Sequence, residues 1–212
     1  MHANAAHLFG HDCALLSDGL RCAQPTTSTA DDTEWHQKSG SLGVKPVEKY
    51  TFGRCDIEVF KIDSTTLYKF AGDLDEKFDG RKFIKPQTEI VRIHLGALRT
   101  VNSVGVREWV YLMREFSDLP TVILEDCSVA VVDQINIVPQ MLGRATVESF
   151  FAPYYCPQCD EEVTCLIRCV DHKSRLLEKK APVLKHDKCQ ADLEFDALED
   201  CYFHQIERFF KP

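Results

Sequence analysis

The sequence has no run of about 18 uninterrupted apolar residues, so no transmembrane helix is expected. It also has no basic segment. Its 25 Lys and Arg are outnumbered by 33 Asp and Glu, which gives a formal net charge of -8. Clustered Lys and Arg are what nucleic acids and anionic membranes require, so we expect neither as the main partner. The N-terminus also lacks the basic start of a signal peptide, and Asp12 interrupts its weakly apolar run. A cytoplasmic location is therefore the expectation.

Cysteine, in contrast, is abundant. The chain has 10 Cys in 212 residues, and four of them fall between Cys156 and Cys169. In an intracellular protein, clustered Cys separated by two residues indicates a metal site more than disulfide bonds. Cys55 and Cys127 are expected to be ordinary core or strand residues. Three further residues lack partners at ligand spacing and are expected to be structural: His172, Cys201 and His204.

The composition divides the chain into three parts. Residues 1–46 are rich in Gly, Ser, Thr, Asp and His without any sustained period, which predicts a flexible tail. Residues 47–153 carry alternating strand and helix patterns and predict one α/β domain. Residues 154–212 are too few to form a comfortable core unaided and contain the Cys cluster, so we expect a metal-stabilised module there.

Within residues 47–153, strands are predicted around Ile57–Phe60, Thr66–Phe70 and Glu89–Leu95. A first helix is expected from a cap at Asp75 through Phe78 and Phe83. Helical spacing of apolar residues then predicts a helix from Val106 to Phe116, capped by Asn102 or Ser103. An apolar strand at Thr121–Leu124, a helix from Val131 to Leu142 ended by Gly143, and a last strand at Val147–Phe151 complete the pattern.

The expected order is strand, strand, helix, strand, helix, strand, helix, strand. Each amphipathic helix has to bury its apolar stripe against the sheet. We therefore predict a mixed β-sheet with the helices mainly on one face, followed by a small β module at the C-terminus.

Two short motifs within residues 54–152 resemble the STAS domain (sulfate transporter and anti-sigma-factor antagonist). One is Gly72-Asp73-Leu74-Asp75, which follows the second strand. The other is the loop Asn102-Ser103-Val104-Gly105 between a strand and a helix, which is similar to the family's signature loop. The resemblance implies a non-enzymatic regulatory module that binds a protein through residues 102–105 and the following helix. The implied partner is an anti-sigma factor or a kinase-like ATPase.

In that family a kinase phosphorylates the Ser or Thr that precedes the loop glycine. Here Val104 occupies that position, and Val cannot be phosphorylated. Asn102 stands where the family has Asp. Ser103 lies one position early, where it is either a phosphorylation site or simply a helix cap. The resemblance therefore implies partner binding more firmly than it implies a phospho-switch.

The strongest chemical signal is Cys156-Pro157-Gln158-Cys159, because a Cys-x-x-Cys turn presents two thiolates to one ion. His186 and Cys189 repeat the two-residue gap and predict the other half of a tetrahedral zinc site. Cys165 and Cys169 are the alternative ligands in place of His186. Cys165 alternates with Val163 and Ile167, which favours a buried thiol instead.

The C-terminal part resembles a zinc ribbon, and bacterial STAS-like proteins with such a ribbon are similar to residues 134–159. A set of four protein ligands leaves no open position for water, which indicates a structural rather than a catalytic metal. Two alternatives remain at this point. One is a thiol redox protein or metal-dependent enzyme that uses the Cys cluster. The other is a nucleic-acid-binding ribbon, which the acidic C-terminal segment disfavours.

Overall fold

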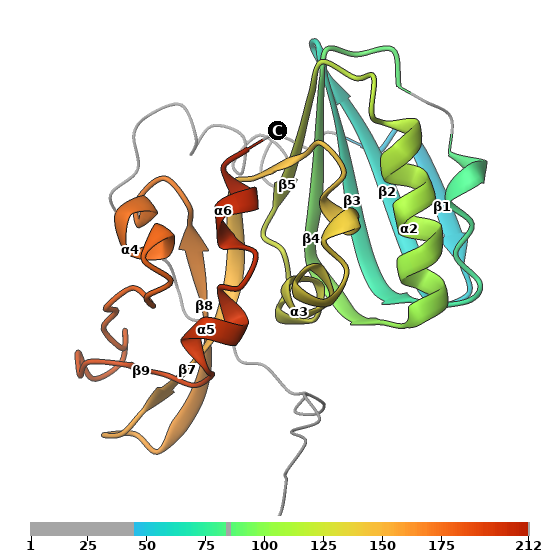
Figure 1. Ribbon diagram of the computed structural model, residues 1–212. Helices are drawn as coiled ribbons and strands as arrows, with labels where there is room; N and C mark the ends of the chain where they lie inside the picture. The colour runs from blue at the N-terminus through green and yellow to red at the C-terminus, as the bar shows by residue number, and fades with distance from the viewer. Residues whose placement is uncertain (1–44, 84–85, 212) are drawn as a thin grey trace, which may run out of the picture.

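The computed structural model describes residues 45–83 and 86–211. It is a mixed α/β structure with one six-stranded and one three-stranded sheet. Figure 1 shows the two sheets side by side, with short C-terminal helices in front of the smaller sheet. The predicted tail falls almost wholly outside the described residues, as do Cys13 and Cys22 within it.

The larger sheet has the strand order β1-β2-β3-β4-β5-β6. Its strands are β1 (Glu48–Phe52), β2 (Cys55–Ile62), β3 (Thr65–Leu74), β4 (Ile90–Val101), β5 (Thr121–Glu125) and β6 (Thr146–Val147). The first three pair antiparallel, and β3, β4, β5 and β6 pair parallel, so the sheet is mixed as predicted. In-register buried side chains such as Val59, Tyr68, Ile93 and Leu124 form one continuous apolar row.

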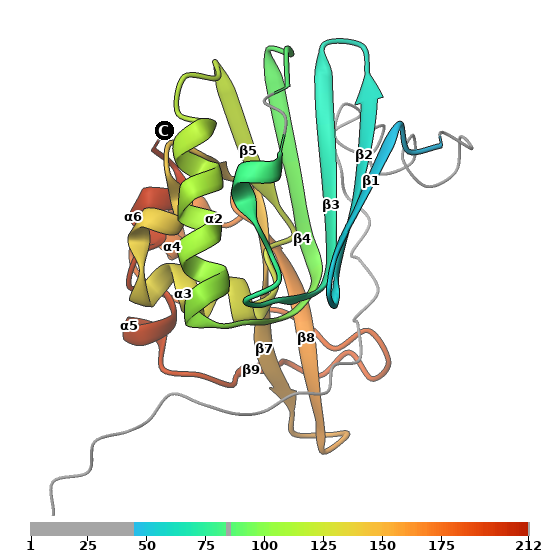
Figure 2. The ribbon, with the colours of Figure 1, turned by 90° about the vertical axis from the view of Figure 1, so that its right-hand side faces the viewer.

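Two helices cover one face of this sheet, as Figure 2 shows. They are α2 (Ser103–Glu115) and α3 (Val129–Ile137). The indole N–H of Trp109 on α2 donates to the carbonyl oxygen of Met141 at 2.8 Å and ties the helix layer together. The apolar stripe that the sequence predicted for α2 is buried against the sheet, so the expectation of helices on one face is confirmed for the described residues.

The helix expected between Asp75 and Phe83 does not form. The structure has only a short 3₁₀ turn there, η1 (Gly80–Lys82). Gly80 lies so close to α2 that a Cβ atom would approach the carbonyl oxygen of Glu108 to 2.4 Å, which leaves no room for a regular helix with side chains. The aromatic residues that suggested a helical face, Phe78 and Phe83, instead pack their rings 5.7 Å apart in the core.

The predicted helix from Val131 to Leu142 forms in two parts. α3 ends at Ile137, and η2 (Pro139–Leu142) continues as a 3₁₀ turn. Pro139 lacks the N–H that an α-helix interior needs, which explains the break. Gly143 follows with φ of 54° and ends the turn, as the sequence predicted.

The last predicted strand is also divided. β6 (Thr146–Val147) closes the first sheet, and β7 (Ser149–Cys156) forms the second sheet with β8 (Glu161–Arg168) and β9 (Glu194–Phe195). The second sheet has the order β8-β7-β9, and β7 pairs antiparallel with both neighbours. β7 therefore runs across the boundary that composition suggested between residues 153 and 154.

Three short helices follow or flank the second sheet: α4 (Lys173–Leu177), α5 (Glu199–Tyr202) and α6 (Ile206–Phe209). The sequence pattern predicted no helix in this part. Phe203 and Phe209 pack edge-on against Phe150 of β7. Asn136 of α3 donates to the carbonyl oxygen of Tyr202 at 2.8 Å and accepts from the N–H of Gln205 at 3.1 Å. The buried side chains of both sheets form a single hydrophobic cluster.

Candidate metal centre

The first half of the centre is the tight turn between β7 and β8. Cys156 is the last residue of β7, and Cys159 lies in the turn before β8 begins. The turn closes at Asp160, which adopts a left-handed conformation with φ of 53°. Tyr155 donates its hydroxyl hydrogen to the Asp160 carboxylate at 2.6 Å. Antiparallel pairing of the two strands thus brings the two thiols to the same end of the hairpin.

The second half is the loop that carries His186 and Cys189. The N–H of His186 donates to the carbonyl oxygen of Ala191 at 2.8 Å, and the N–H of Gln190 donates back to the carbonyl of His186 at 2.7 Å. Gln190 has a positive φ of 60°, which turns the chain sharply after Cys189. These bonds present Nδ1 of His186 and Sγ of Cys189 towards the hairpin.

The four donor atoms lie within 4.8 Å of one another. Sγ of Cys156 is 3.5 Å from Sγ of Cys189, and Nδ1 of His186 is 3.4 Å from Sγ of Cys159 and 3.3 Å from Sγ of Cys189. Around a tetrahedral zinc ion, two sulfurs are about 3.8 Å apart, and a nitrogen and a sulfur about 3.6 Å. The donor set therefore has the shape and the chemistry of a metal site.

The electrostatics of the cluster also favour a cation. Burial raises the pKa of the Cys156 thiol, but hydrogen bonds from the backbone N–H of Cys159, the Cys189 thiol and the N–H of Gln158 together with the Cys159 thiol outweigh it, and the net shift is downward. The hydrogen bond with Cys189, followed by burial, raises the pKa of Cys159 to about 12. Crowded thiols resist losing a second proton unless a positive charge compensates the thiolates, and a bound ion supplies that charge.

A carboxylate stands behind the histidine ligand. Nε2 of His186 is 3.9 Å from Oε2 of Glu161, and Lys188 Nζ donates to both oxygens of the same carboxylate at 2.7 and 2.9 Å. In metal sites the far nitrogen of a ligating imidazole usually donates to a carboxylate, a carbonyl or water. At 3.9 Å the Glu161 carboxylate lies beside this nitrogen, beyond hydrogen-bond distance. Sequence analysis missed Glu161, because only the folded hairpin brings residue 161 next to residue 186.

The other cysteines of residues 45–83 and 86–211 are not part of this cluster. Cys165 and Cys169, the alternative ligands, are buried at 5% and 3% exposure within the shared core. Burial raises the pKa of Cys169 to about 12, which is the environment of a core thiol. Cys55 and Cys127 are fully buried, as expected, and Cys201 and His204 are exposed and outside the donor set.

The loop Asn102–Gly105 lies at the start of α2. The side chain of Asn102 accepts from the N–H of Gly105 at 2.8 Å, so Asn102 rather than Ser103 is the cap. Asn102 and Ser103 are both exposed. The N–H of Asn102 donates to the carbonyl oxygen of Leu74, and a Cβ atom on Gly105 would lie 2.1 Å from that oxygen.

A second polar group lies on the sheet face opposite α2. Nε2 of His94 is 3.0 Å from Oδ2 of Asp126, and the Ser149 hydroxyl donates to Oδ1 of Asp126 at 2.6 Å. The carboxylate stands between the hydroxyl and the imidazole. In a nucleophile–base pair the histidine would contact the hydroxyl directly. The arrangement matches a structural polar network at the join between the two sheets.

Within the described residues, no helix combines the length and the apolar character that crossing a bilayer requires. Comparison of the chain with protein-family models, with curated proteins and with solved structures gives no match. What the molecule does has to be inferred from its own residues.

Proposed function

We propose that the chain is a non-enzymatic regulatory module that binds another protein, is similar to the antagonists of anti-sigma factors, and is stabilised by a structural zinc ion. The observation that carries the protein-binding part is the meeting of the two STAS-like motifs at one end of the sheet, where Asn102 and Ser103 are exposed. Gly72–Asp75 ends β3, and residues 102–105 begin α2 directly beside it.

Specific contacts support this pairing of motifs. Thr100 donates its hydroxyl hydrogen to Asp73 at 3.0 Å, and the Asn102 side-chain amide donates to Glu76 at 3.2 Å. Gly72 has φ of +97°, and a Cβ atom there would lie 1.8 Å from the carbonyl oxygen of Arg54. Both motif glycines are thus required by close backbone approach, and the packed loop presents Ser103 to solvent.

The zinc part rests on the four donors Cys156, Cys159, His186 and Cys189. Three sulfurs and one imidazole form a closed set of borderline-soft ligands that suits zinc. The ion would pin the β7–β8 turn to the loop at residues 186–189. Because both sheets share one hydrophobic core, this staple would stabilise the whole structure rather than a separate module.

Metal analysis of the purified full chain tests the zinc part. We expect one zinc per chain by mass spectrometry, and loss of the metal in His186→Ala and Cys156→Ser. The matched variants Cys165→Ala and Cys169→Ala should keep one zinc per chain. Retention of zinc in His186→Ala together with its loss in Cys165→Ala would assign the ligands differently.

Site-specific cross-linking tests protein binding. The full chain with a photoreactive residue at position 103 is expressed in the source cells. On illumination it should cross-link to one defined protein. The same residue at Lys61, an exposed position on β2, is the control and should capture nothing. The captured partner is then purified and titrated against the chain by calorimetry. Equal capture at both positions, or no heat on titration, would contradict the proposal.

A further inference from the structure

The helix layer contains an open groove between α2 and the turn that follows α3. Two adjoining depressions of about 360 and 370 Å³ share Val110, Arg114 and Gln140, so they form one continuous channel. We call it the α2 groove. It begins at Ser103 and ends near Gly143. From residue 103 to residue 114 the helix rises about 17 Å, the length of three helical turns.

The walls of the α2 groove are partly apolar. Val110 of α2, Val138 and Pro139 line it, together with Val106 and Met113, which are almost fully buried. One large side chain of the lining, Tyr111, is 40% exposed to water. Apolar side chains gathered along one channel are a feature of surfaces that bind other molecules.

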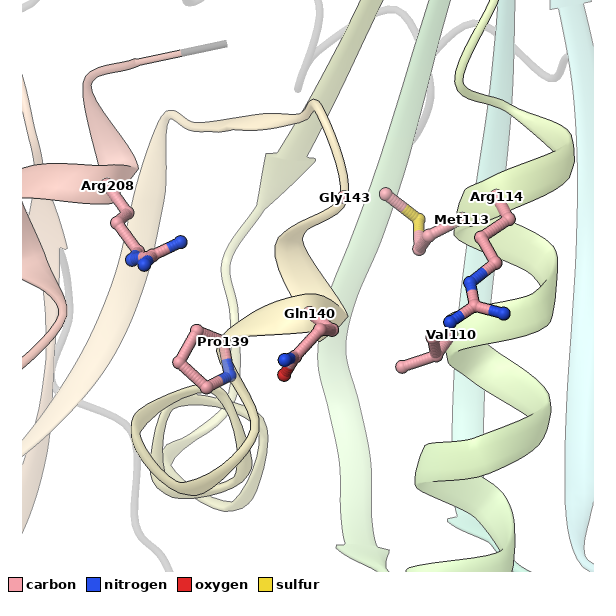
Figure 3. Close-up of a pocket in the computed structure, with 7 residues that line it drawn as sticks. All are labelled: Val110, Met113, Arg114, Pro139, Gln140, Gly143 and Arg208. Atoms are coloured by element: carbon pink, nitrogen blue, oxygen red, sulfur yellow. The ribbon is translucent and has the colours of Figure 1, made fainter.

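The charge of the α2 groove is opposite to that of the chain. Among the described residues that line it, three are arginines and none is a carboxylate. Arg114 comes from α2, and Arg208 comes from α6 in the C-terminal part. Arg107, also from α2, already contacts the buried carboxylate of Glu108 at 3.3 Å, so Arg114 and Arg208 contribute most to the positive charge. Figure 3 shows Arg208 and Arg114 on opposite sides of the depression, with Pro139, Gln140 and Val110 between them. Because the whole chain has a net charge of -8, this local excess of positive charge distinguishes the groove from the chain as a whole and favours an acidic ligand.

We propose that the α2 groove binds an acidic amphipathic segment of a partner protein. Apolar side chains of the segment would lie on Val110, Tyr111 and Val138, and its carboxylates would pair chiefly with Arg114 and Arg208 and also with Arg107. An anionic membrane is a poorer match, because the narrow channel offers three cations on a molecule that is otherwise acidic. This inference rests on the proposed protein-binding function and adds the chemistry of the partner.

The position of Arg208 gives the C-terminal part a role in this binding. α6 is held in place by packing of Phe209 on Phe150 and by the contact of Asn136 with Gln205. The metal-stabilised half of the chain would therefore supply one wall of the groove as well as stability.

Selection from a library of random displayed peptides about 12 residues long, a little over three helical turns, tests the inference on the full chain. We expect enriched peptides that are acidic and amphipathic. A synthetic, fluorescently labelled winner should bind in anisotropy measurements, more weakly as salt is raised, and its Glu→Gln version should bind less well. The single variants Arg107→Glu, Arg114→Glu and Arg208→Glu should each weaken binding about tenfold.

Lys61→Glu is the matched control, because it changes the net charge equally but lies on β2, and it should bind the peptide as the parent chain does. Hydrogen exchange should show protection by the peptide at residues 103–114 and 137–143. If the peptides bind all three arginine variants as tightly as the parent chain, the proposal for the α2 groove is wrong, whereas the proposed protein-binding function still stands. Enrichment of no peptide would overturn both. If the chain binds phosphatidylserine vesicles but no peptide, the occupant is an anionic membrane and the proposal is wrong. If the chain self-associates and Arg114→Glu abolishes this, the occupant is a second copy of the chain.

Discussion

Oε2 of Glu161 lies 3.9 Å from Nε2 of His186, on the ring nitrogen opposite the one that faces the thiols. The same carboxylate is held by Lys188, one residue before Cys189. Glu161 thus connects the hairpin that carries two of the thiols with the loop that carries the other two ligands, and it does so outside the donor set.

Replacing this carboxylate should weaken metal binding without removing the site. We expect Glu161→Gln to lower zinc affinity about tenfold, because the site loses the negative charge beside the far nitrogen of His186. Competition with a chromophoric chelator measures the affinity. Glu162→Gln, at the exposed neighbouring position, is the control and should leave the affinity unchanged. Equal affinities for the two variants would mean that Glu161 does not support the histidine.

Asn136 joins the helix layer to the C-terminal helices, so its loss should destabilise the whole chain. Asn136→Ala would leave the Tyr202 carbonyl and the Gln205 N–H without their partner, which costs about 1–3 kcal/mol in the free energy of unfolding. Urea denaturation measures this, with Gln134→Ala on the same helix as the control. If the C-terminal part were independent, the unfolding of the large sheet would not change.

Gly105→Ala should lower the free energy of unfolding, whereas the same change within a helix usually raises it. Within a helix, Gly→Ala normally stabilises by about 1 kcal/mol. At position 105 the added Cβ would lie 2.1 Å from the Leu74 carbonyl oxygen, so we expect destabilisation of about 1–3 kcal/mol. Thermal unfolding measures it, and Ser103→Ala at the exposed start of the helix should be nearly neutral. A stabilised Gly105→Ala variant would show that the loop is not packed against β3.

Because Asp133 on α3 is partly buried, we expect the free energy of unfolding to depend on pH. Burial raises its pKa in the folded state. The folded chain therefore holds this proton more tightly than the unfolded chain, and the free energy of unfolding falls as the pH rises through the raised pKa. Asp133→Asn should be more stable than the parent chain at neutral pH, and the gain should shrink as the solution is acidified.

Urea denaturation of Asp133→Asn at about pH 7.5 and at successively lower pH values at which the chain stays folded, with zinc in excess, measures this difference. The exposed residue Glu89, changed to Gln, is the control and should show no gain at any of these pH values. A gain for Asp133→Asn that is the same at all of them would contradict the stated cause.

Most strands of the large sheet could be predicted from residue patterns, because each has apolar side chains that alternate or run continuously. The cap and apolar face of α2 were equally plain in the sequence. The helix expected after Asp75 was wrong because its spacing of aromatics satisfied a helical pattern, whereas the observed chain passes too close to α2 at Gly80 for a helix to form. The helices α5 and α6 were missed because each has only four residues and depends on packing against Phe150.

The sequence by itself indicated Cys156, Cys159 and Cys189 as donors, because a two-residue gap suits a tight metal-binding turn, but it left His186, Cys165 and Cys169 as alternatives for the fourth. The folded structure brought His186 into the cluster. The sequence also determined the large sheet and its helix layer through hydrophobic periodicity. Only the tertiary structure decided that Glu161 stands behind His186, that Arg208 completes the α2 groove, and that both sheets share one core. These relationships join residues far apart in the chain, and they depend on how β7 carries the chain from one sheet into the other.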